Sequence, residues 1–180
     1  MLSCKVIPLK IESFSHLNSI FYSKDSKVTY VVANNSTAHT FRLSDIIQLN
    51  EDFSIRSILL TKVHSVHNVC EYKGELMYCD SNHWKLMLGE KCIFETDMLL
   101  RGLSINDDFI FIGGSDTDFT GKKRSNSDSF LYILNHDGHL TWNCKFEGMG
   151  NLKEIRQLEG ADLAMSYDCY DNSHFGVNFS

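Results

Sequence analysis

Proline and long apolar runs are both scarce in this sequence. Pro8 is the single proline among 180 residues, and no window approaches the roughly 18 apolar residues that a membrane-spanning helix needs. The first residues, MLSCKVIPLK, also lack the apolar segment of a secretory signal. From these features we expect a cytoplasmic protein without a membrane partner.

A concentrated positive charge is missing as well. The chain has 17 Lys and Arg against 23 Asp and Glu, which gives a formal net charge of -6. Its densest basic run is Lys122-Lys123-Arg124. Nucleic-acid binding normally requires a basic face or stripe. We therefore expect no nucleic-acid partner.

The six cysteines form no CxxC pair; they stand at positions 4, 70, 79, 92, 144 and 169. If Lys73-Gly74 is a two-residue turn, Cys70 faces Met77 and Cys79 faces Asn68, so these two thiols are not directly opposed. Free and mostly buried thiols are therefore favoured over a disulfide framework.

What the sequence does contain is a repeat. Val66–Ser81 aligns without a gap on Leu100–Ser115, which sets His67 on Arg101 and Asn68 on Gly102. Each copy has the pattern of a strand, a tight turn and a second strand. A looser copy begins at Asn18, and a fourth begins at Asn151.

Further short strands are expected around these copies, bounded by turn residues. An Asp-Gly pair at Asp137-Gly138 is a strong hairpin signal, with His136 and His139 exposed beside it. Leu43–Phe53 fits one or two helical turns, or a loop. The expected strands are Val6–Ile11, Ser19–Ser23, Val28–Asn34, Thr40–Leu43, Ser57–Thr61, Lys85–Leu88, Lys91–Glu95, Phe130–Leu134, Leu140–Phe146, Lys153–Leu158 and Leu163–Tyr167.

The repeat predicts an all-β, propeller-like array of about four four-stranded antiparallel blades within one domain. The blades are expected at residues 16–62, 63–98, 99–148 and 149–180, with the last one incomplete. A β-sandwich is the alternative. An incomplete array leaves an open edge strand, at which self-association is expected. Three explanations of the incomplete array are open: another chain supplies the missing blades, the sequence is part of a longer protein, or the N-terminal strand closes the last sheet.

Three runs carry a resemblance to a known family: HSVHNVCEYKGELMYCDSN, LLRGLSINDDFIFIGGSD and FEGMGNLKEIRQLEG. They resemble the C-terminal half of an uncharacterised, mainly bacterial propeller-like family, a domain of unknown function with some members labelled tetratricopeptide-repeat proteins. The resemblance covers about residues 60–165 and rests on His67, Asp80, Arg101-Gly102-Leu103 and Glu154-Ile155. It implies a fold and no settled activity. The chain departs from the family in its shorter length and in Gly113-Gly114-Ser115.

Four residues form the candidate ligand site: His67, Arg101, Lys153 and Asp80. In the repeat, His67, Arg101 and Lys153 share one position at the start of the innermost strand, at the expected channel mouth. Converging cationic groups there would bind an anion such as a phosphate or carboxylate. The alternative is that they tie neighbouring blades together, with Asp80 and Glu154 as partners.

A catalytic metal site is a second interpretation of the same region. One divalent ion held by His67, Asp80 and a residue of another blade would make the protein a metal-dependent hydrolase or lyase. No HExxH, GxSxG or phosphate-loop motif accompanies these residues. The main expectation is therefore that no cofactor is bound.

The leading functional hypothesis is a non-catalytic binding or protein-interaction module. Its ligand would be an anion at the channel mouth, or a carbohydrate on a groove lined by Trp84, Trp142, Tyr30 and Tyr78, although packing roles suit these aromatic residues better. A third hypothesis is a truncated propeller without independent activity.

Overall fold

The described part of the chain folds into three consecutive four-stranded antiparallel sheets. The computed structural model describes residues 16–34, 43–61, 63, 65–116 and 126–157. Sheet 1 contains β1 (His16–Ser23), β2 (Val28–Asn34), β3 (Asp45–Leu49) and β4 (Ile55–Leu60). Sheet 2 contains β5 (Val66–Tyr72), β6 (Glu75–Asp80), β7 (Lys85–Leu88) and β8 (Lys91–Glu95), and sheet 3 contains β9 (Leu99–Ile105), β10 (Ile110–Ser115), β11 (Ser129–Leu134) and β12 (Leu140–Phe146).

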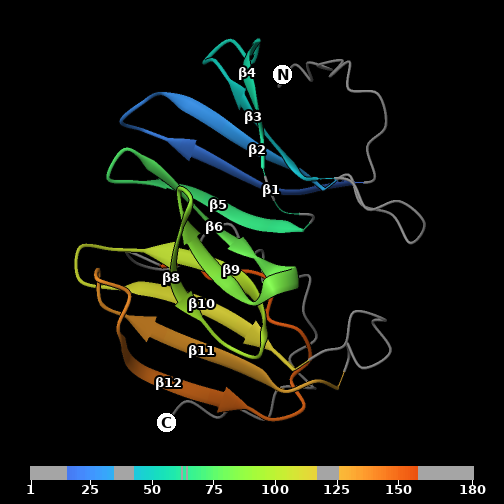
Figure 1. Cartoon of the computed structure of the whole chain (residues 1–180), viewed down its shortest axis with the longest axis vertical. Coiled ribbons are helices and arrows are strands. Elements are labelled where there is room, and N and C mark those ends of the chain that lie inside the picture. Colours follow the sequence, from blue (N-terminus) through green and yellow to red (C-terminus); the bar gives the residue numbers. More distant parts are fainter. Residues whose placement is uncertain (1–15, 35–42, 62, 64, 117–125, 158–180) are drawn as a thin grey trace, which may run out of the picture.

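Within each sheet the strands are paired in the order in which they occur in the sequence. A single 3-10 turn, η1 (Ser81–His83), connects β6 to β7 in the described part of the chain. Figure 1 shows the three sheets following one another along the long axis of the molecule. The all-β prediction is therefore confirmed, together with the antiparallel four-stranded units.

The sheets pack face to face because alternate residues of each strand point to opposite faces. On one side of sheet 2, Val66 and Val69 pack against a buried cluster of sheet 1. On its other side, Met77, Cys79 and Leu86 pack against sheet 3. The sheet 1 members of the first cluster are Val28, Tyr30, Val32 and Ile46, and the sheet 3 members of the second include Leu100, Leu103, Ile110, Ile112, Tyr132 and Leu134.

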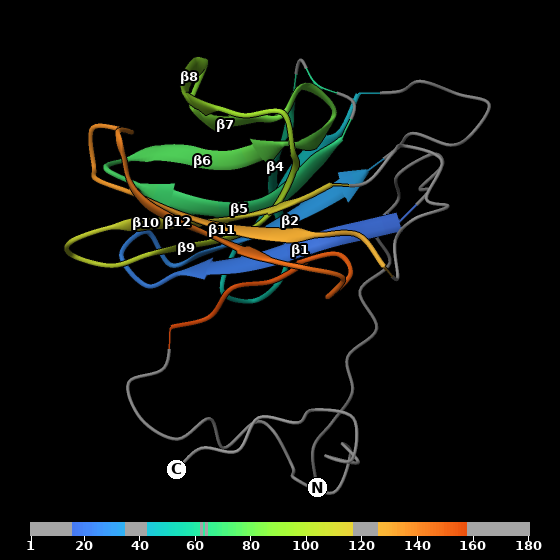
Figure 2. The same ribbon diagram turned by 90° about the horizontal axis from the view of Figure 1, so that it is seen from below.

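The first strands of the three sheets are neighbours: β1 contacts β5, and β5 contacts β9. The hairpin turns β1–β2, β5–β6, β9–β10 and β11–β12 lie at the same end of the molecule in both views (Figures 1 and 2). His136 links three of these turns. Its Nδ1 accepts from the Tyr72 hydroxyl at 2.7 Å and its Nε2 donates to the Asp107 carbonyl at 2.9 Å. His136 was predicted to be exposed but is partly buried by these contacts, whereas His139 is exposed as predicted.

Many of the predicted strands match closely. Lys85–Leu88, Lys91–Glu95 and Leu140–Phe146 have the predicted bounds, and Asp137-Gly138 forms the hairpin turn with Gly138 at φ 86°. The turn after β1 occupies four residues, against two at Lys73-Gly74.

The prediction for residues 43–53 was wrong. Asp45–Leu49 is strand β3, paired with β2 and β4, so neither a helix nor a loop describes it. Ile46 and Ile47 are buried on opposite faces of this strand, and β-branched residues suit such a position. The third strand of sheet 1 is therefore β3, and not Thr40–Leu43, of which residues 40–42 lie outside the described residues.

The fourth unit has no regular secondary structure over residues 151–157, where the strand Lys153–Leu158 was predicted. The predicted strands Val6–Ile11 and Leu163–Tyr167 lie outside the described residues. Leu152 and Ile155 nevertheless pack on sheet 3. A Cβ added at Gly113 would overlap the Leu152 side chain, and one at Gly102 would lie 3.1 Å from Ile155.

Candidate functional site at the inner strands

The candidate site is built on an irregularity that recurs in the first strand of each sheet. The pairing register shifts between Leu17 and Ser19 in β1 and between His67 and Val69 in β5. In β9 the same shift occurs at Gly102. A bulge of this kind leaves one residue out of the ladder and turns it away from its strand. The three bulge residues are Asn18, Asn68 and Gly102.

Two of these residues have left-handed backbones. Asn68 has φ 46° and Gly102 has φ 77°. Glycine adopts this region freely, and asparagine tolerates it better than most other residues. The equivalence of Asn68 and Gly102 in the sequence repeat therefore corresponds to a shared backbone conformation.

Asn68 joins three parts of the chain through its side-chain amide. Its Oδ1 accepts from the backbone NH of Gly102 at 2.7 Å. Its Nδ2 lies 3.3 Å from Oε2 of Glu154 and 3.5 Å from the carbonyl oxygen of Lys153. Asn18 makes the corresponding link between sheets 1 and 2, where its Nδ2 donates to the carbonyl of Val66 at 3.1 Å.

A second recurring link joins a serine hydroxyl to the backbone of the next unit. The NH of Val66 donates to Ser44 Oγ at 3.1 Å. Ser81 Oγ donates to the carbonyl of Leu100 at 2.6 Å. The NH of Leu152 donates to Ser115 Oγ at 3.0 Å. Val66, Leu100 and Leu152 are equivalent in the repeat. A serine hydroxyl therefore bonds to the backbone of the segment after residue 150, as serine hydroxyls bond to the backbones of β5 and β9.

His67 is a buried residue of this linkage. Its Nδ1 lies 2.8 Å from Ser81 Oγ. Since the single hydroxyl proton of Ser81 is given to Leu100, the proton of this second bond belongs to Nδ1 of His67. Ser81 is fully buried, so the Ser81–His67 pair does not expose a hydroxyl for nucleophilic attack.

The other three predicted site residues differ in exposure. Arg101 is partly buried in β9, and Lys153 is exposed. Asp80 is buried, and its carboxylate lies 2.9 Å from Nδ1 of His83, so its near partner is a histidine of the following turn. Asn68 brings the backbones next to Arg101 and Lys153 together, because it bonds to Gly102 and to Lys153 itself.

Glu154 adds a carboxyl group to this region. Partial burial raises its pKa, while Arg156 and the bond from Asn68 act in the opposite direction. The carboxyl is therefore protonated at a higher pH than an ordinary glutamate.

A metal centre finds little support in the described ranges. No group of three or more His, Cys, Asp or Glu side chains there is placed to hold a metal ion. The buried thiols are also poor ligands, because burial raises the pKa of Cys70 to about 12 and that of Cys79 further. Cys70, Cys79, Cys92 and Cys144 are free, as predicted for the described cysteines, and the first two are buried.

The Asn68 bulge corrects one predicted pairing. Cys70 is paired with Met77 as expected, but Cys79 is paired with His67 and not with Asn68. The extra residue in β5 displaces the register by one position beyond the bulge.

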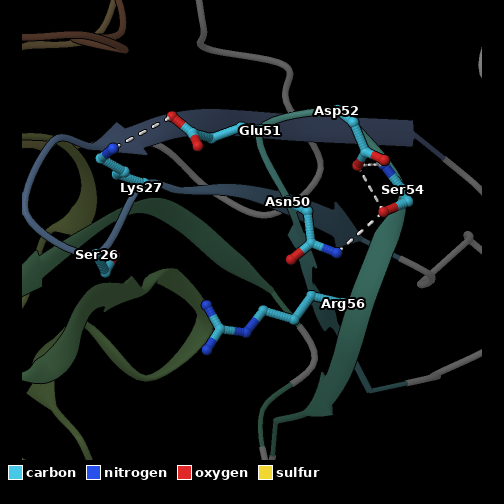
Figure 3. A pocket seen from close by; sticks show the side chains of 7 residues that line it. All are labelled: Ser26, Lys27, Asn50, Glu51, Asp52, Ser54 and Arg56. Carbon is cyan, nitrogen blue, oxygen red and sulfur yellow. Dashed lines mark hydrogen bonds and ion pairs between the residues drawn. The ribbon is translucent and has the colours of Figure 1, made fainter.

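A polar depression lies elsewhere, at the turns of sheet 1 (Figure 3). It is open, has a volume of about 530 Å³, and is lined by Ser26, Lys27, Asn50, Glu51, Asp52, Ser54 and Arg56. Several of these side chains already bind one another: Ser54 Oγ donates to Asp52 at 2.6 Å, and Lys27 lies 4.0 Å from Glu51. Its mixed charge does not favour one class of ligand.

The four aromatic residues considered for a carbohydrate groove are divided between burial and exposure. Tyr30 is buried and Tyr78 is partly buried, whereas Trp84 and Trp142 are exposed. Tyr30 donates its hydroxyl to Glu71 at 3.1 Å, and Tyr78 donates to the carbonyl of Gly89 at 3.3 Å. Both tyrosines therefore pack and bond within the protein.

Sequence reasoning did not identify Asn68, Ser81 or Ser115 as linking residues. A signal was present, since the gap-free repeat sets Asn68 on Gly102 and Ser81 on Ser115. The predicted site contained charged and histidine side chains, and the amide and hydroxyl side chains at equivalent positions were not included in it.

Comparisons with known proteins leave the family open. No protein-family model matches the chain, and no curated protein has significant similarity to it. The resemblance to a propeller-like family therefore rests on the quoted residues alone. Among the described residues, no helix is long and apolar enough to cross a membrane.

Proposed function

We propose that the three sheets are blades of a β-propeller-like array. Three features support this arrangement: consecutive contact of the first strands, hairpin turns at one end, and bulges at equivalent positions of those strands. A β-sandwich consists of two facing sheets, whereas here sheet 2 packs on both sides. The sheet order in the sequence also suits blades added one after another.

We propose further that the protein is a non-catalytic module that binds a small anion beside the Asn68 bulge, with Arg101 and Lys153 as ligands. The carrying observation is that Asn68 bonds both to the residue after Arg101 and to Lys153. The planar guanidinium of arginine matches phosphate or carboxylate oxygens, and lysine adds a second positive charge.

The other two predicted residues have supporting roles in this proposal. His67 donates to Ser81 and stabilises the junction between sheets 2 and 3. Asp80 lies 2.9 Å from Nδ1 of His83 and fixes the turn that follows β6. The raised pKa of Glu154 also weakens its repulsion of a bound anion as the pH falls.

Calorimetric titration of the protein with inorganic phosphate in a chloride buffer tests the anion site. We expect Arg101→Gln to weaken phosphate binding by about tenfold or more, which corresponds to about 1.4 kcal/mol. Lys153→Gln should weaken it less, because Lys153 is exposed and its charge is better screened.

Lys91→Gln is the matched control, since Lys91 is an exposed lysine on β8. The affinity of this variant for phosphate should equal that of the unmodified protein. Absence of phosphate binding by the unmodified protein, or equal affinity for phosphate in the Arg101→Gln protein, would contradict the anion site.

A further inference from the structure

A carboxyl group lies beside the two proposed ligands of the anion. Asn68 Nδ2 lies 3.5 Å from the carbonyl oxygen of Lys153 and 3.3 Å from Oε2 of Glu154. Asn68 Oδ1 accepts from the NH of Gly102, the residue after Arg101. A Cβ added at Gly102 would also lie 3.3 Å from the backbone carbonyl carbon of Glu154. Glu154 is therefore a neighbour of both segments that supply the proposed ligands.

Electrostatic effects on a buried thiol place the same charged groups together. The thiol of Cys79 is fully buried at the junction of sheets 2 and 3. Burial is the main cause of its raised pKa, and the charges of Arg101 and Glu154 also act on it, in opposite directions. Because such effects weaken with distance, the guanidinium and the carboxyl lie on the same part of this junction.

One oxygen of the Glu154 carboxyl is available to a ligand. Asn68 bonds to Oε2, and among the described residues no hydrogen bond is formed to Oε1. Burial raises the pKa of Glu154, whereas Arg156 and the bond from Asn68 favour its ionised form. In a slightly alkaline buffer the group is thus a carboxylate, which accepts hydrogen bonds and donates none.

A carboxylate in an anion site distinguishes between oxyanions of equal charge. In slightly alkaline solution, monohydrogen phosphate and sulfate have the same charge and a similar size, but only phosphate keeps a proton that it can donate. Toward sulfate, the carboxylate contributes like-charge repulsion and an acceptor that faces another acceptor. Toward phosphate, it accepts a charge-assisted O–H···O hydrogen bond, which offsets the repulsion.

We propose that Glu154 makes the anion site selective for monohydrogen phosphate over sulfate, with Oε1 accepting the hydrogen bond of the phosphate hydroxyl. Arg101 and Lys153 neutralise the charge of the bound ion. The same arrangement disfavours phosphate esters, because their dianions have no hydroxyl on phosphorus. The inference rests on the anion site proposed above and adds the identity of its ligand.

Calorimetric titrations with phosphate, sulfate and methyl phosphate, all in one slightly alkaline chloride buffer, test this selectivity. We expect the unmodified protein to bind phosphate at least about tenfold more tightly than either other anion, a difference of about 1.4 kcal/mol. Methyl phosphate distinguishes free phosphate from a phosphate ester as the ligand. This comparison uses the unmodified chain, so it does not depend on the folding of a variant.

Glu154→Gln identifies the selective group. Glutamine keeps an oxygen that can accept from Asn68, but its amide is uncharged and can donate to sulfate. The preference for phosphate should therefore fall below about threefold, mainly because sulfate binds more tightly. Glu95→Gln is the matched control, since it removes the same charge from an exposed residue of β8 and should keep the preference.

The possible results separate this selectivity from the anion site itself. Equal affinity of the unmodified protein for phosphate and sulfate would overturn the selectivity and leave the anion site in place. So would a preference for phosphate that survives Glu154→Gln, or methyl phosphate that binds as tightly as phosphate. Binding of neither phosphate nor sulfate would contradict the anion site, and the selectivity with it.

Discussion

At the scale of single residues, Asn68 combines two requirements that few side chains meet together. It occupies a left-handed backbone conformation and bonds to Gly102 on one side and to Glu154 on the other. Glycine would satisfy the backbone but would leave the Gly102 NH without its acceptor. A larger polar residue would make the bonds at the cost of backbone strain.

Glu154 gives the clearest prediction at this scale. Because burial raises its pKa, the folded protein binds this proton more tightly than the unfolded chain. Its effect on the free energy of unfolding is therefore most favourable below the ordinary glutamate pKa of 4.5. This contribution to stability is lost as the pH rises from 4.5 through the raised pKa of Glu154 in the folded protein.

Urea unfolding of the unmodified protein and of Glu154→Gln across this pH window measures the contribution. The stability of the glutamine variant relative to the unmodified protein should increase as the pH rises, because glutamine does not ionise. A difference between the two proteins that stays constant with pH would contradict the raised pKa.

Residue-level predictions of strand pairing were correct where the hairpin turn alone determines the pairing. They were wrong where the pairing also depends on contacts with another sheet. Pairing of Cys70 with Met77 followed from the short turn at Lys73-Gly74. Pairing of Cys79 required knowledge of the Asn68 bulge, which depends on contacts with β9 and Glu154. Such long-range contacts leave no local pattern in the sequence.

At the scale of elements, Gly113 determines how closely the fourth unit approaches sheet 3. A Cβ at this position would overlap both the Leu152 side chain and the carbonyl oxygen of Arg101. We expect Gly113→Ala to lower the free energy of unfolding by about 1–3 kcal/mol, since overpacking forces backbone or side-chain shifts of this cost. Equilibrium unfolding in urea measures the change.

The double variant Gly113→Ala/Leu152→Ala separates the two contacts. Its loss of stability should be smaller than the sum of the single losses, because removal of the Leu152 side chain relieves one overlap. Additive losses would mean that Leu152 does not pack on Gly113.

Elements with alternating or β-branched residues between clear turns could be predicted from the sequence. The hairpins of sheets 2 and 3 belong to this class. Strand β3 was not predicted, because Ser44-Asp45 resembles a helix start. The isoleucines of β3 are buried on both of its faces, which removes the alternation of a half-buried strand. The fourth unit had the pattern of a strand, but residues 151–157 make side-chain contacts and single backbone bonds in place of a ladder.

At the scale of the whole molecule, sheet 2 lies between sheets 1 and 3 and packs on one of them through each of its faces. We expect amide hydrogens of its inner strand β6 to exchange more slowly than those of its edge strand β8, most of whose residues are exposed. Hydrogen exchange by NMR or mass spectrometry on the unmodified protein measures this. Slower exchange in β8 than in β6 would contradict the expectation.

The sequential strand order of each sheet has a consequence for how this chain can vary. Each sheet is complete before the next begins, and Val66 and Leu100 start equivalent segments 34 positions apart. Duplication or deletion of one such segment in frame would change the number of sheets without rethreading any strand. The length of the array can thus evolve in whole units while the serine and asparagine links at each junction are copied with it.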